Sequence, residues 1–398
     1  MSRLKEQWVF HISDAELERR WEAARRIMRE QRIDALVMQA SNEFKGGYLR
    51  WFTDSVAKFD GPVSVVFPLE GRMTLIVSGP RGGRREIAPD MVTPYRGVGL
   101  VLTEPYSQAD CITDHADGEL AVGVLRELAP KRIGMLGLGS MRYSFGEAIY
   151  RAFPDCDIIN ASDAIDRIKA IKSPEEIALI RQCAQMQDEI WELVLDYVRP
   201  GMREYEVATY AYAQCQLKGS TDGLILTGSA PLGVASVKGH RHFQNRVLQK
   251  GDQFTMLIEV NGPGGYYTEL GRTCVLGRAS QELLDEFEIV REAQDATVAL
   301  LRPGATPTEI WSRHNAFMRG RDRPEENRLF CHGQGYDLVE RPALRDDDAM
   351  PVAAGMNLVV HPTYATSRVY SWLCDNFLVQ DHATPRLHGT ERKIFELE

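Results

Sequence analysis

The sequence of 398 residues contains no apolar run that approaches the ~18 residues a membrane-spanning helix requires. It has no C-x-x-C pair, and its seven cysteines are an odd number, which argues against both a zinc-binding cysteine cluster and a fully paired disulfide framework. The first 20 residues lack the apolar core of a signal peptide. We therefore expect a cytoplasmic protein with reduced, buried thiols and no membrane partner.

The sequence also lacks a concentrated positive charge. Its formal net charge is −9, and both signs are spread along the chain. The one dense basic stretch, residues 81–86 (RGGRRE), is short and is predicted to be a solvated loop. Because phosphate binding requires clustered Lys and Arg, we expect no nucleic-acid partner.

The first 160 residues alternate between helix and strand patterns. Helices are predicted at 15–30, 117–129 and 144–152, and strands at 33–39, 62–67, 73–78 and 132–138. Such alternation is typical of an α/β domain with a largely covered sheet. We assign residues 1–160 to this N-terminal domain.

A strong helix start opens the second domain, residues 161–398. Ser173 is placed as the N-cap, Pro174 at the first helical position and Glu176 at the capping-box position. The helix is predicted to run to about Tyr197, and a short linking helix is predicted just before it, in the segment SDAIDRIKAIK.

The second domain contains a faint internal repeat. Residues 195–211 resemble residues 298–314, because each segment combines a helix, an Arg-Pro-Gly stop and a second helix. Strands are predicted at 253–260 and 266–277 as a hairpin around NGPGG, and at 356–362 and 368–379. We infer an α+β architecture in which a curved antiparallel sheet is flanked by two helix pairs related by a pseudo-twofold axis.

Polar residues that interrupt these apolar strands are the candidate site residues. His240 and His242 are two residues apart, so on a strand their rings would share one side. Glu259 ends the apolar run of the first hairpin strand and Glu269 lies on the partner strand, but the pattern does not set their register. Glu269 can therefore bind a metal, move a proton or pair with Arg272.

The segment LFCHGQGYDLVERP places His332, Tyr336 and Glu340 around two glycines. This pattern suits either close approach of the backbone to a ligand or plain turn geometry. His361 closes an apolar strand and is either a core histidine or a site residue. Asp375 lies within an apolar strand, so its carboxylate is either paired or functional.

Three histidines, two glutamates and an aspartate from separate strands allow two kinds of site. One is a metal site of mixed nitrogen and oxygen ligands. The other is a metal-free site, in which a neutral histidine exchanges a proton while carboxylates fix its tautomer and orient the substrate.

Several blocks of the second half resemble the pita-bread superfamily of creatinase, prolidase, aminopeptidase P and methionine aminopeptidase. They run from IKSPEEIALIRQ through RPGMREYEVA, NRVLQKGDQF, GYYTELGRT, LRPGATPTEI and HGQG to GMNLVVHP, and they cover most of residues 165–380. The first half is similar, more weakly, to the N-terminal domain of creatinase and prolidase, with ASNEFKGGYLRWFTD in place of an Asn-x-x-Tyr-Leu-x-Gly-Phe block. The resemblance implies an N-terminal α/β domain followed by a pita-bread catalytic domain.

The resemblance also bears on metal binding. The peptidases of this superfamily hold two ions with two Asp, one His and two Glu, and these positions correspond here to Ile258, Glu269, Tyr336, His361 and Cys374. Glu269 is the one carboxylate left in register, whereas a two-ion site needs bridging carboxylates. We therefore expect no metal ion and no other cofactor.

Creatinase, the metal-free member, is the more instructive resemblance. Its catalytic histidine corresponds to His240, and its Gly-Tyr-Tyr-Thr is reproduced in the segment that contains Tyr267. Its two substrate-binding glutamates correspond to Gly271 and His361, so the contacts specific for creatine are missing. The resemblance implies a creatinase-like, metal-independent hydrolase that acts on a C–N bond of a small polar metabolite.

In this interpretation His240 is the general acid and base, and Glu269 orients the substrate. His361 and Tyr336 are auxiliary proton or hydrogen-bonding groups. Six further residues are assigned to substrate binding: His242, Glu259, His332, Glu340, Tyr267 and Asp375.

Three alternatives stay open. A metal-dependent hydrolase or peptidase could use a rewired mononuclear site, and its imidazole-rich ligands would come from His240, His242, Glu269, His332, His361 and Asp375. A β-elimination lyase uses the same proton chemistry. A non-catalytic binding module is the third, although the retained histidines argue against a pocket that has lost its catalytic residues.

Creatinase and its relatives form dimers in which the N-terminal domain of one chain covers the site of the other. By this resemblance we expect a homodimer in which Asp54 or Lys58 reaches the substrate of the neighbouring chain.

Overall fold

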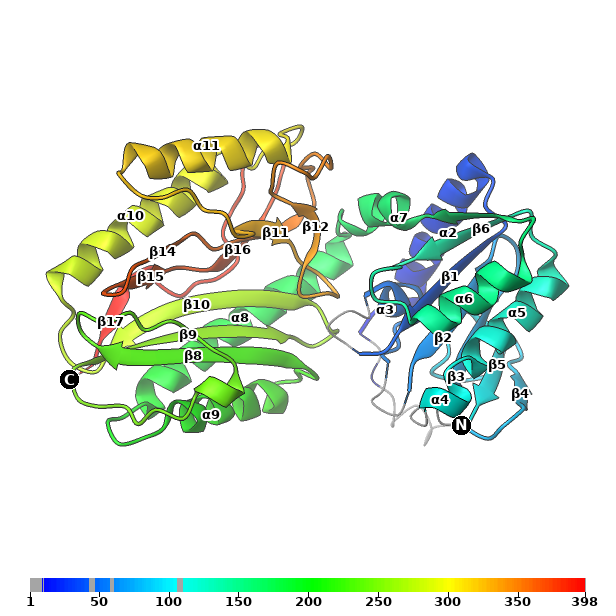
Figure 1. Ribbon diagram of the computed structural model, residues 1–398, viewed down its shortest axis with the longest axis horizontal. Helices are drawn as coiled ribbons and strands as arrows, with labels where there is room; N and C mark the ends of the chain where they lie inside the picture. Colours follow the sequence, from blue (N-terminus) through cyan, green and yellow to red (C-terminus); the bar gives the residue numbers. More distant parts are fainter. Residues whose placement is uncertain (1–8, 10, 43–46, 58–60, 106–109, 398) are drawn as a thin grey trace. The chain divides into compact units, whose positions relative to one another are not determined.

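The computed structural model describes residues 9, 11–42, 47–57, 61–105 and 110–397. The chain divides into two compact units, residues 1–169 and 170–398, which are coloured blue to teal and green to red in Figure 1. The predicted linking helix, α7 (Ser162–Lys169), belongs to the first unit. None of the described helices is long and apolar enough to cross a membrane.

The first unit is built on a seven-stranded sheet with the order β4-β5-β3-β2-β1-β6-β7. Strands β2 and β4 run antiparallel to their neighbours, and the other neighbouring strands are parallel. The strands are β1 (Ala35–Ala40), β2 (Val63–Pro68), β3 (Met73–Ser78), β4 (Gly83–Glu86), β5 (Val98–Glu104), β6 (Arg132–Leu136) and β7 (Asp157–Asn160). The helices besides α7 are α2 (Asp14–Gln31), α3 (Gly47–Thr53), α4 (Asp110–Thr113), α5 (Ala116–Leu128) and α6 (Tyr143–Ala152).

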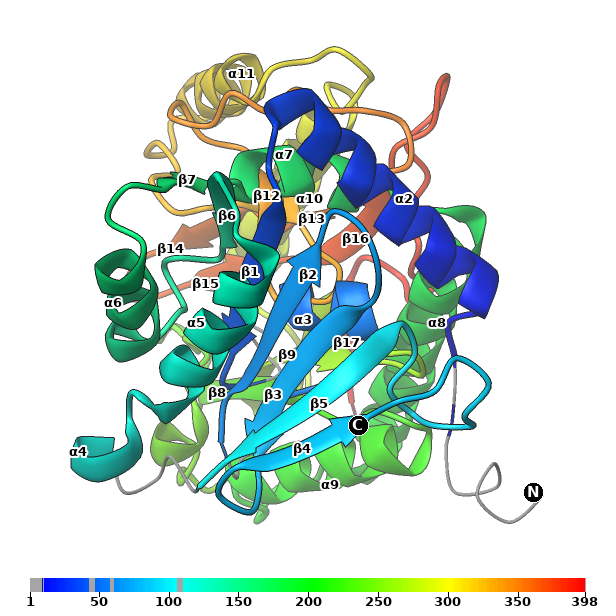
Figure 2. The same cartoon turned by 90° about the vertical axis from the view of Figure 1, so that its right-hand side faces the viewer.

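Helices α5 and α6 bury one face of this sheet, where their apolar side chains pack against residues of β1, β2, β3 and β5. In Figure 2 they lie on one side of the sheet and α2 lies on the other, as expected for a largely covered α/β sheet. The basic stretch at 81–86 differs from the predicted loop. Residues 83–86 form β4, because the open edge of β5 offers backbone groups that β4 pairs with while its charged side chains stay exposed.

The second unit contains two four-stranded sheets, with the orders β17-β10-β9-β8 and β12-β11-β13-β16, and a separate pair of β14 and β15. Neighbouring strands are antiparallel except β10 and β17. Backbone bonds between Gly271 and Cys374 join the two larger sheets. The strands are β8 (Gly223–Pro231), β9 (Asp252–Asn261), β10 (Tyr267–Val275), β11 (Cys331–Gly333), β12 (Glu340–Ala343), β13 (Asn357–Val360), β14 (Thr363–Ala365), β15 (Tyr370–Trp372), β16 (Asp375–Leu378) and β17 (Ile394–Glu396).

Two helix pairs cover these sheets, as the internal repeat predicted. The helices are α8 (Pro174–Tyr197), α9 (Glu204–Leu217), α10 (Gln281–Val298) and α11 (Pro307–Gly320). The first pair packs on β9 and β10 and the second on β11, β13 and β16 (Figure 1). Gly201 and Gly304, the glycines of the two Arg-Pro-Gly stops, have φ values of 96° and 90°. Side chains other than glycine rarely adopt this conformation, which lets the chain turn toward the next helix after α8 has ended at Tyr197 and α10 at Val298.

Local signals predicted α8 well. The Ser173 side chain accepts a hydrogen bond from the Glu176 backbone, and the Glu176 side chain accepts one from the Ser173 backbone at 2.6 Å. The strand predicted at 368–379, in contrast, is two strands. The chain changes partners at Cys374, which bonds to β10, so β15 pairs with β14 and β16 pairs with β13.

Candidate active site

The hairpin of β9 and β10 brings two glutamates together. Glu259 lies directly opposite Glu269, so both carboxylates extend from the same face of the hairpin. The two residues are 8% and 5% exposed. Ile258, which the family resemblance placed at a ligand position, belongs instead to the apolar core beneath α8. The register that the sequence left open therefore creates a buried carboxylate pair.

Burial changes the acidity of both groups. It raises the pKa of Glu269 from an ordinary 4.5 to about 7, against the opposing charge of Lys238. Burial and the neighbouring charge of Glu269 raise the pKa of Glu259 well above its ordinary value. The pair therefore retains protons at a pH where exposed carboxyl groups are ionised.

A chain of buried amides orients this pair. The Nδ2 group of Asn376 donates to Oε1 of Gln334 at 2.9 Å, and its Oδ1 accepts from the Glu269 backbone at 2.7 Å. The Gln334 oxygen thus accepts from Asn376, which leaves the Gln334 Nε2 group directed at Glu259. This Nε2 group donates a hydrogen bond to Oε1 of Glu259 at 3.1 Å. The amides hold Glu259 and β10 in fixed positions.

Two neutral histidines face Glu269. Nδ1 of His332, on β11, lies 2.9 Å from the Gly333 carbonyl oxygen, which can only accept, so Nδ1 carries the proton. Its Nε2 therefore presents a lone pair, 3.8 Å from Oε2 of Glu269. That oxygen has no hydrogen-bond partner among the described residues. Burial lowers the pKa of His332 to about 4.

His361, which follows β13, completes the cluster. Its ring packs edge-on against His332 with centroids 5.3 Å apart. Burial and the charges of His332, Arg328 and Lys238 lower its pKa well below the ordinary value. One ligand atom from each of Glu269, His332 and His361 lies within 4.8 Å of the others.

An apolar wall and one lysine border the two glutamates. The wall consists of Leu224, Leu226, Ala235, Leu257, Val359, Tyr370, Trp372 and Cys374. The Nζ atom of Lys238 donates to the Tyr370 hydroxyl at 2.9 Å and lies 3.7 Å from the centroid of the Trp372 ring. The arrangement combines proton-holding groups, a cation and apolar surface, which suits acid/base chemistry on a small molecule.

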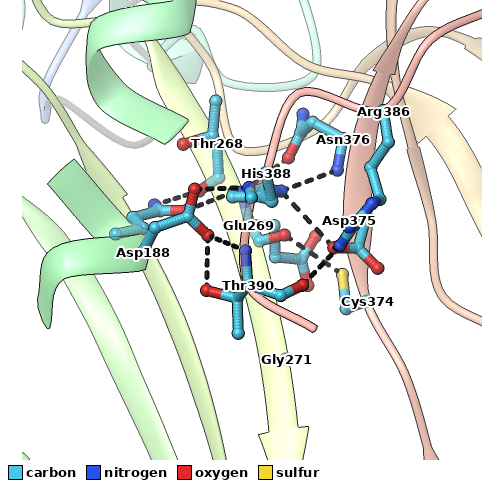
Figure 3. Close-up of polar contacts among 12 residues, drawn as sticks. Asp188, Thr268, Glu269, Gly271, Cys374, Asp375, Asn376, Arg386, His388 and Thr390 are labelled. Carbon is cyan, nitrogen blue, oxygen red and sulfur yellow. Dashed lines mark hydrogen bonds and ion pairs between the residues drawn. The ribbon is translucent and has the colours of Figure 1, made fainter. Parts of the chain in front are cut away.

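Asp375 lies in a buried network with Arg386 and His388, drawn in Figure 3, which adjoins the amides of the site because the Asn376 backbone donates to Nδ1 of His388. Its Oδ1 is 2.6 Å from Nη2 of Arg272 and 3.3 Å from Nη1 of Arg386. Burial opposes the charge, but Arg272, His388 and Arg386 together lower the pKa of Asp375. Of the two alternatives for Asp375, the paired one applies, and Arg272 pairs with it rather than with Glu269.

Three other predicted residues contact the beginning of α8 or the segment around Gly335. Tyr336 stacks on Tyr266 with centroids 4.1 Å apart, and the Tyr266 hydroxyl donates to Glu176. Glu340 forms a buried ion pair with Lys172 at 2.7 Å and accepts from the Tyr336 backbone at 2.9 Å. Tyr267 is buried at the start of β10, where its backbone donates to the Gly335 carbonyl at 2.7 Å.

The pair His240 and His242 is not on a strand. His240 caps the short 3-10 helix η1 (Arg241–Phe243), and both histidines are exposed. They line a cavity of about 690 Å³ together with Tyr212, Leu224 and other residues of α9 and β8. Leu224 lies opposite Glu259 on the neighbouring strand, so this cavity adjoins the glutamate site across β8.

The two residues proposed to reach a neighbouring chain are in the first unit. Asp54 is half-buried and forms an ion pair with Arg96. Lys58 lies outside the described residues.

Sequence reasoning missed Lys238, Gln334, Trp372 and Asn376. Gln334 stands inside the HGQG block and Lys238 two residues before His240, so proximity to the quoted motifs was the available signal. Nothing in the pattern around Trp372 or Asn376 distinguishes them from core residues.

With this geometry in place, the chain can be assigned to a family. The model of metallopeptidase family M24 matches residues 178–381, just over half of the chain, and the chain belongs to that family. It is 25% identical to the uncharacterized peptidase YqhT of Bacillus subtilis over 240 residues, 58% of this chain and 65% of that protein. It is 25% identical to the Xaa-Pro dipeptidase of Pyrococcus furiosus over 275 residues, 66% of this chain and 76% of that protein.

A creatinase from a Bacillus species is 28% identical over 252 residues, 58% of this chain and 59% of that protein. The chain thus matches less than two thirds of the length of this creatinase and of YqhT. Among solved structures, the X-Pro aminopeptidase of Thermotoga maritima has a TM-score of 0.76 at 18% identity, covering 95% of this chain and 99% of that chain. Dipeptidase PepE of Mycobacterium ulcerans has a TM-score of 0.77 at 20% identity, covering 97% and 99%. These neighbours confirm the predicted fold, an N-terminal α/β domain and a C-terminal pita-bread domain.

The family name implies a metal, and the residues present fit one ion but not two. A two-ion centre requires carboxylates that bridge cations ~3.5–4 Å apart, whereas Tyr336 and Cys374 stand at two of the ligand positions. A single ion fits better, because the Nε2 lone pair of His332 and the unpartnered Oε2 of Glu269 converge with His361.

Proposed function

We propose that the protein is a metal-independent hydrolase that cleaves a C–N bond of a small polar metabolite. The observation that carries this proposal is the buried pair of Glu259 and Glu269 beside the neutral rings of His332 and His361. The sequence assigned the proton transfer to His240, and we propose that Glu269 performs it instead.

The pKa of about 7 suits Glu269 for this role, because both protonation states are populated near neutral pH. In the first step its carboxylate takes a proton from water while the water oxygen bonds to the substrate carbon. In the second step the carboxylic acid returns that proton to the nitrogen as the C–N bond breaks. The lone pair of His332 orients the water or the acid, and protonated Glu259 donates a hydrogen bond to the substrate.

The experiment is a metal and activity measurement on one preparation. Elemental analysis of the purified protein is combined with a screen for amine release from Xaa-Pro dipeptides, creatine and N-acyl amino acids, with and without a chelator. We expect less than stoichiometric metal, activity that survives chelation, and a kcat reduced about 10²-fold or more in Glu269→Gln. The exposed Glu192 of α8 provides the control variant Glu192→Gln, which should retain full activity. Stoichiometric metal together with activity lost to the chelator would contradict the proposal.

A second candidate is a hydrolase with a single metal ion. It is favoured by Oε2 of Glu269 and Nε2 of His332, which lie 3.8 Å apart and can both give a lone pair to a cation when Glu269 is ionised. Glu269, His332 and His361 would hold the ion, which would activate a bound water. The same elemental analysis decides between the two candidates.

His240 keeps a testable role of its own. The resemblance to creatinase makes it a proton-transfer group, and its position on the neighbouring cavity leaves access to substrate. His242 offers a matched control in the same segment. If His240→Ala has the same kcat as His242→Ala, His240 is not the proton-transfer group that the resemblance implies. A lower kcat for His240→Ala than for His242→Ala would support that role.

We also propose a homodimer in which the N-terminal domain of one chain reaches the site of its partner. Size-exclusion chromatography with light scattering measures the mass. A protein that is monomeric by mass and fully active would contradict this proposal.

A further inference from the structure

Lys238 is the charged residue of the site to which neither the sequence nor the family resemblance assigns a role. It lies between β8 and η1 and is half-buried. Its ammonium group is held at two points, by the hydrogen bond to the Tyr370 hydroxyl at 2.9 Å and by the Trp372 ring at 3.7 Å. The negative face of an indole ring attracts a cation, so both contacts restrain the ammonium group. Lys238 is therefore a fixed charge rather than a mobile surface lysine.

The position of Trp372 depends on a glycine. A Cβ atom at Gly271 would lie 2.2 Å from Cη2 of Trp372 and 2.7 Å from Cβ of Cys374. Only a residue without a side chain lets the indole lie across β10 at this point. The ammonium group of Lys238 is thus held by Tyr370 and Trp372, and Gly271 leaves the space that Trp372 occupies.

The same glycine places this ammonium group relative to the glutamates. Gly271 lies two residues after Glu269 on β10 and therefore on the same face. Trp372 lies against Gly271, so it holds the ammonium group of Lys238 on the side of the hairpin that carries Glu259 and Glu269.

Arg328 is the other positive group whose charge reaches Glu269. Arg328 is already engaged, since it pairs with Glu326 at 2.9 Å and donates to Thr363 at 2.6 Å. Among the described residues, Lys238 forms no ion pair of its own and contacts the Tyr370 hydroxyl and the Trp372 ring, so it contributes a positive charge on this face that no carboxylate neutralises by direct contact.

We propose that Lys238 is a positioning residue that supplies the positive charge for which this family ordinarily requires a metal ion. Its ammonium group acts through Glu259 and Glu269, offsetting the negative charge that the buried pair acquires when Glu269 ionises to act as a base. This inference rests on the proposed metal-independent function. It also explains why Gly271 and Trp372 occur together, because each is needed to seat the lysine.

The test is Mn²⁺ binding to the full-length protein, measured by isothermal titration calorimetry and by the paramagnetic resonance of the bound ion. If Lys238 occupies the electrostatic place of a cation, Lys238→Met should bind Mn²⁺ about tenfold or more tightly than the wild type. Lys238→Arg retains the charge and should bind as weakly as the wild type. Lys250, exposed in the same unit, supplies the control Lys250→Met, which should not change the affinity.

The Arg variant separates charge from packing, because a purely structural role would alter Lys238→Arg and Lys238→Met alike. Equal Mn²⁺ affinities for Lys238→Met and Lys250→Met would overturn the inference. Finding a stoichiometric metal in the wild-type protein by elemental analysis would instead contradict the proposed metal-independent function. The Mn²⁺ titration therefore tests the role of Lys238, and the elemental analysis tests the proposed function.

Discussion

Replacing Glu269 by glutamine tests the buried acid directly, because glutamine keeps the shape of the protonated side chain and cannot ionise. In the folded protein the pKa of Glu269 is about 7, compared with an ordinary 4.5. The folded state therefore binds this proton more tightly than the unfolded chain does. The stability that the proton confers is fully present below pH 4.5 and is lost as the pH rises to 7 and beyond.

The magnitude follows from the shift. One pKa unit corresponds to about 1.4 kcal/mol, so moving from 4.5 to about 7 makes the ionised side chain cost about 3 kcal/mol of unfolding free energy at alkaline pH. Glu269→Gln avoids that cost. The charge of Glu269 also helps to raise the pKa of Glu259. Removing that charge makes ionisation of Glu259 less costly, so it further increases the stability of the variant at alkaline pH.

The assay is urea unfolding followed by circular dichroism at several pH values between 4 and 9. We expect the variant and the wild type to be equally stable near pH 4, and the variant to be more stable by about 3 kcal/mol at pH 8 to 9. Glu192→Gln, on the exposed face of α8, should match the wild type throughout. A difference that stays constant across this range would refute the reasoning and would indicate a bound cation that keeps Glu269 ionised.

Two further predictions concern the support of the site. Gly271→Ala brings a Cβ atom to 2.2 Å from Trp372, so we expect a loss of about 1–3 kcal/mol and an altered near-ultraviolet circular dichroism spectrum. Gly320→Ala, where a Cβ meets nothing within 4 Å, is the control, and equal stability of the two variants would contradict the close approach. Asp375→Ala leaves the fully buried Arg272 without its carboxylate, and urea unfolding should show a loss of about 3–5 kcal/mol. A loss below about 1 kcal/mol would mean that the backbone carbonyls around Arg272 satisfy it alone.

The helices of the second domain could be predicted because their signals are local. Ser173 and Glu176 are three residues apart, and their capping bonds form within a single turn whatever the rest of the chain does. The Arg-Pro-Gly segments give a second local signal, since proline disfavours continuation of the helix and Gly201 adopts a positive φ in the turn that follows α8.

The site was predicted only in part, for a physical reason. The sequence singled out Glu269, His332 and His361 as polar residues in apolar strands, and the structure brings these three together. It could not pair Glu259 with Glu269, because a shift of one residue in the hairpin would turn the opposite set of side chains toward the site. It could not show that His240 precedes η1 and His242 lies on it, rather than both on a strand.

What the sequence determined by itself is therefore the helices of the second domain, the hairpin and the chemical types available for a site. The tertiary structure alone decided which of those groups meet. Lys238 bonds to Tyr370 across 132 positions, and Arg272 bonds to Asp375 across 103. Contacts between residues so far apart in the sequence depend on how the two sheets join at Gly271 and Cys374. Interactions within one turn or one strand do not determine that junction, so the local sequence pattern cannot predict it.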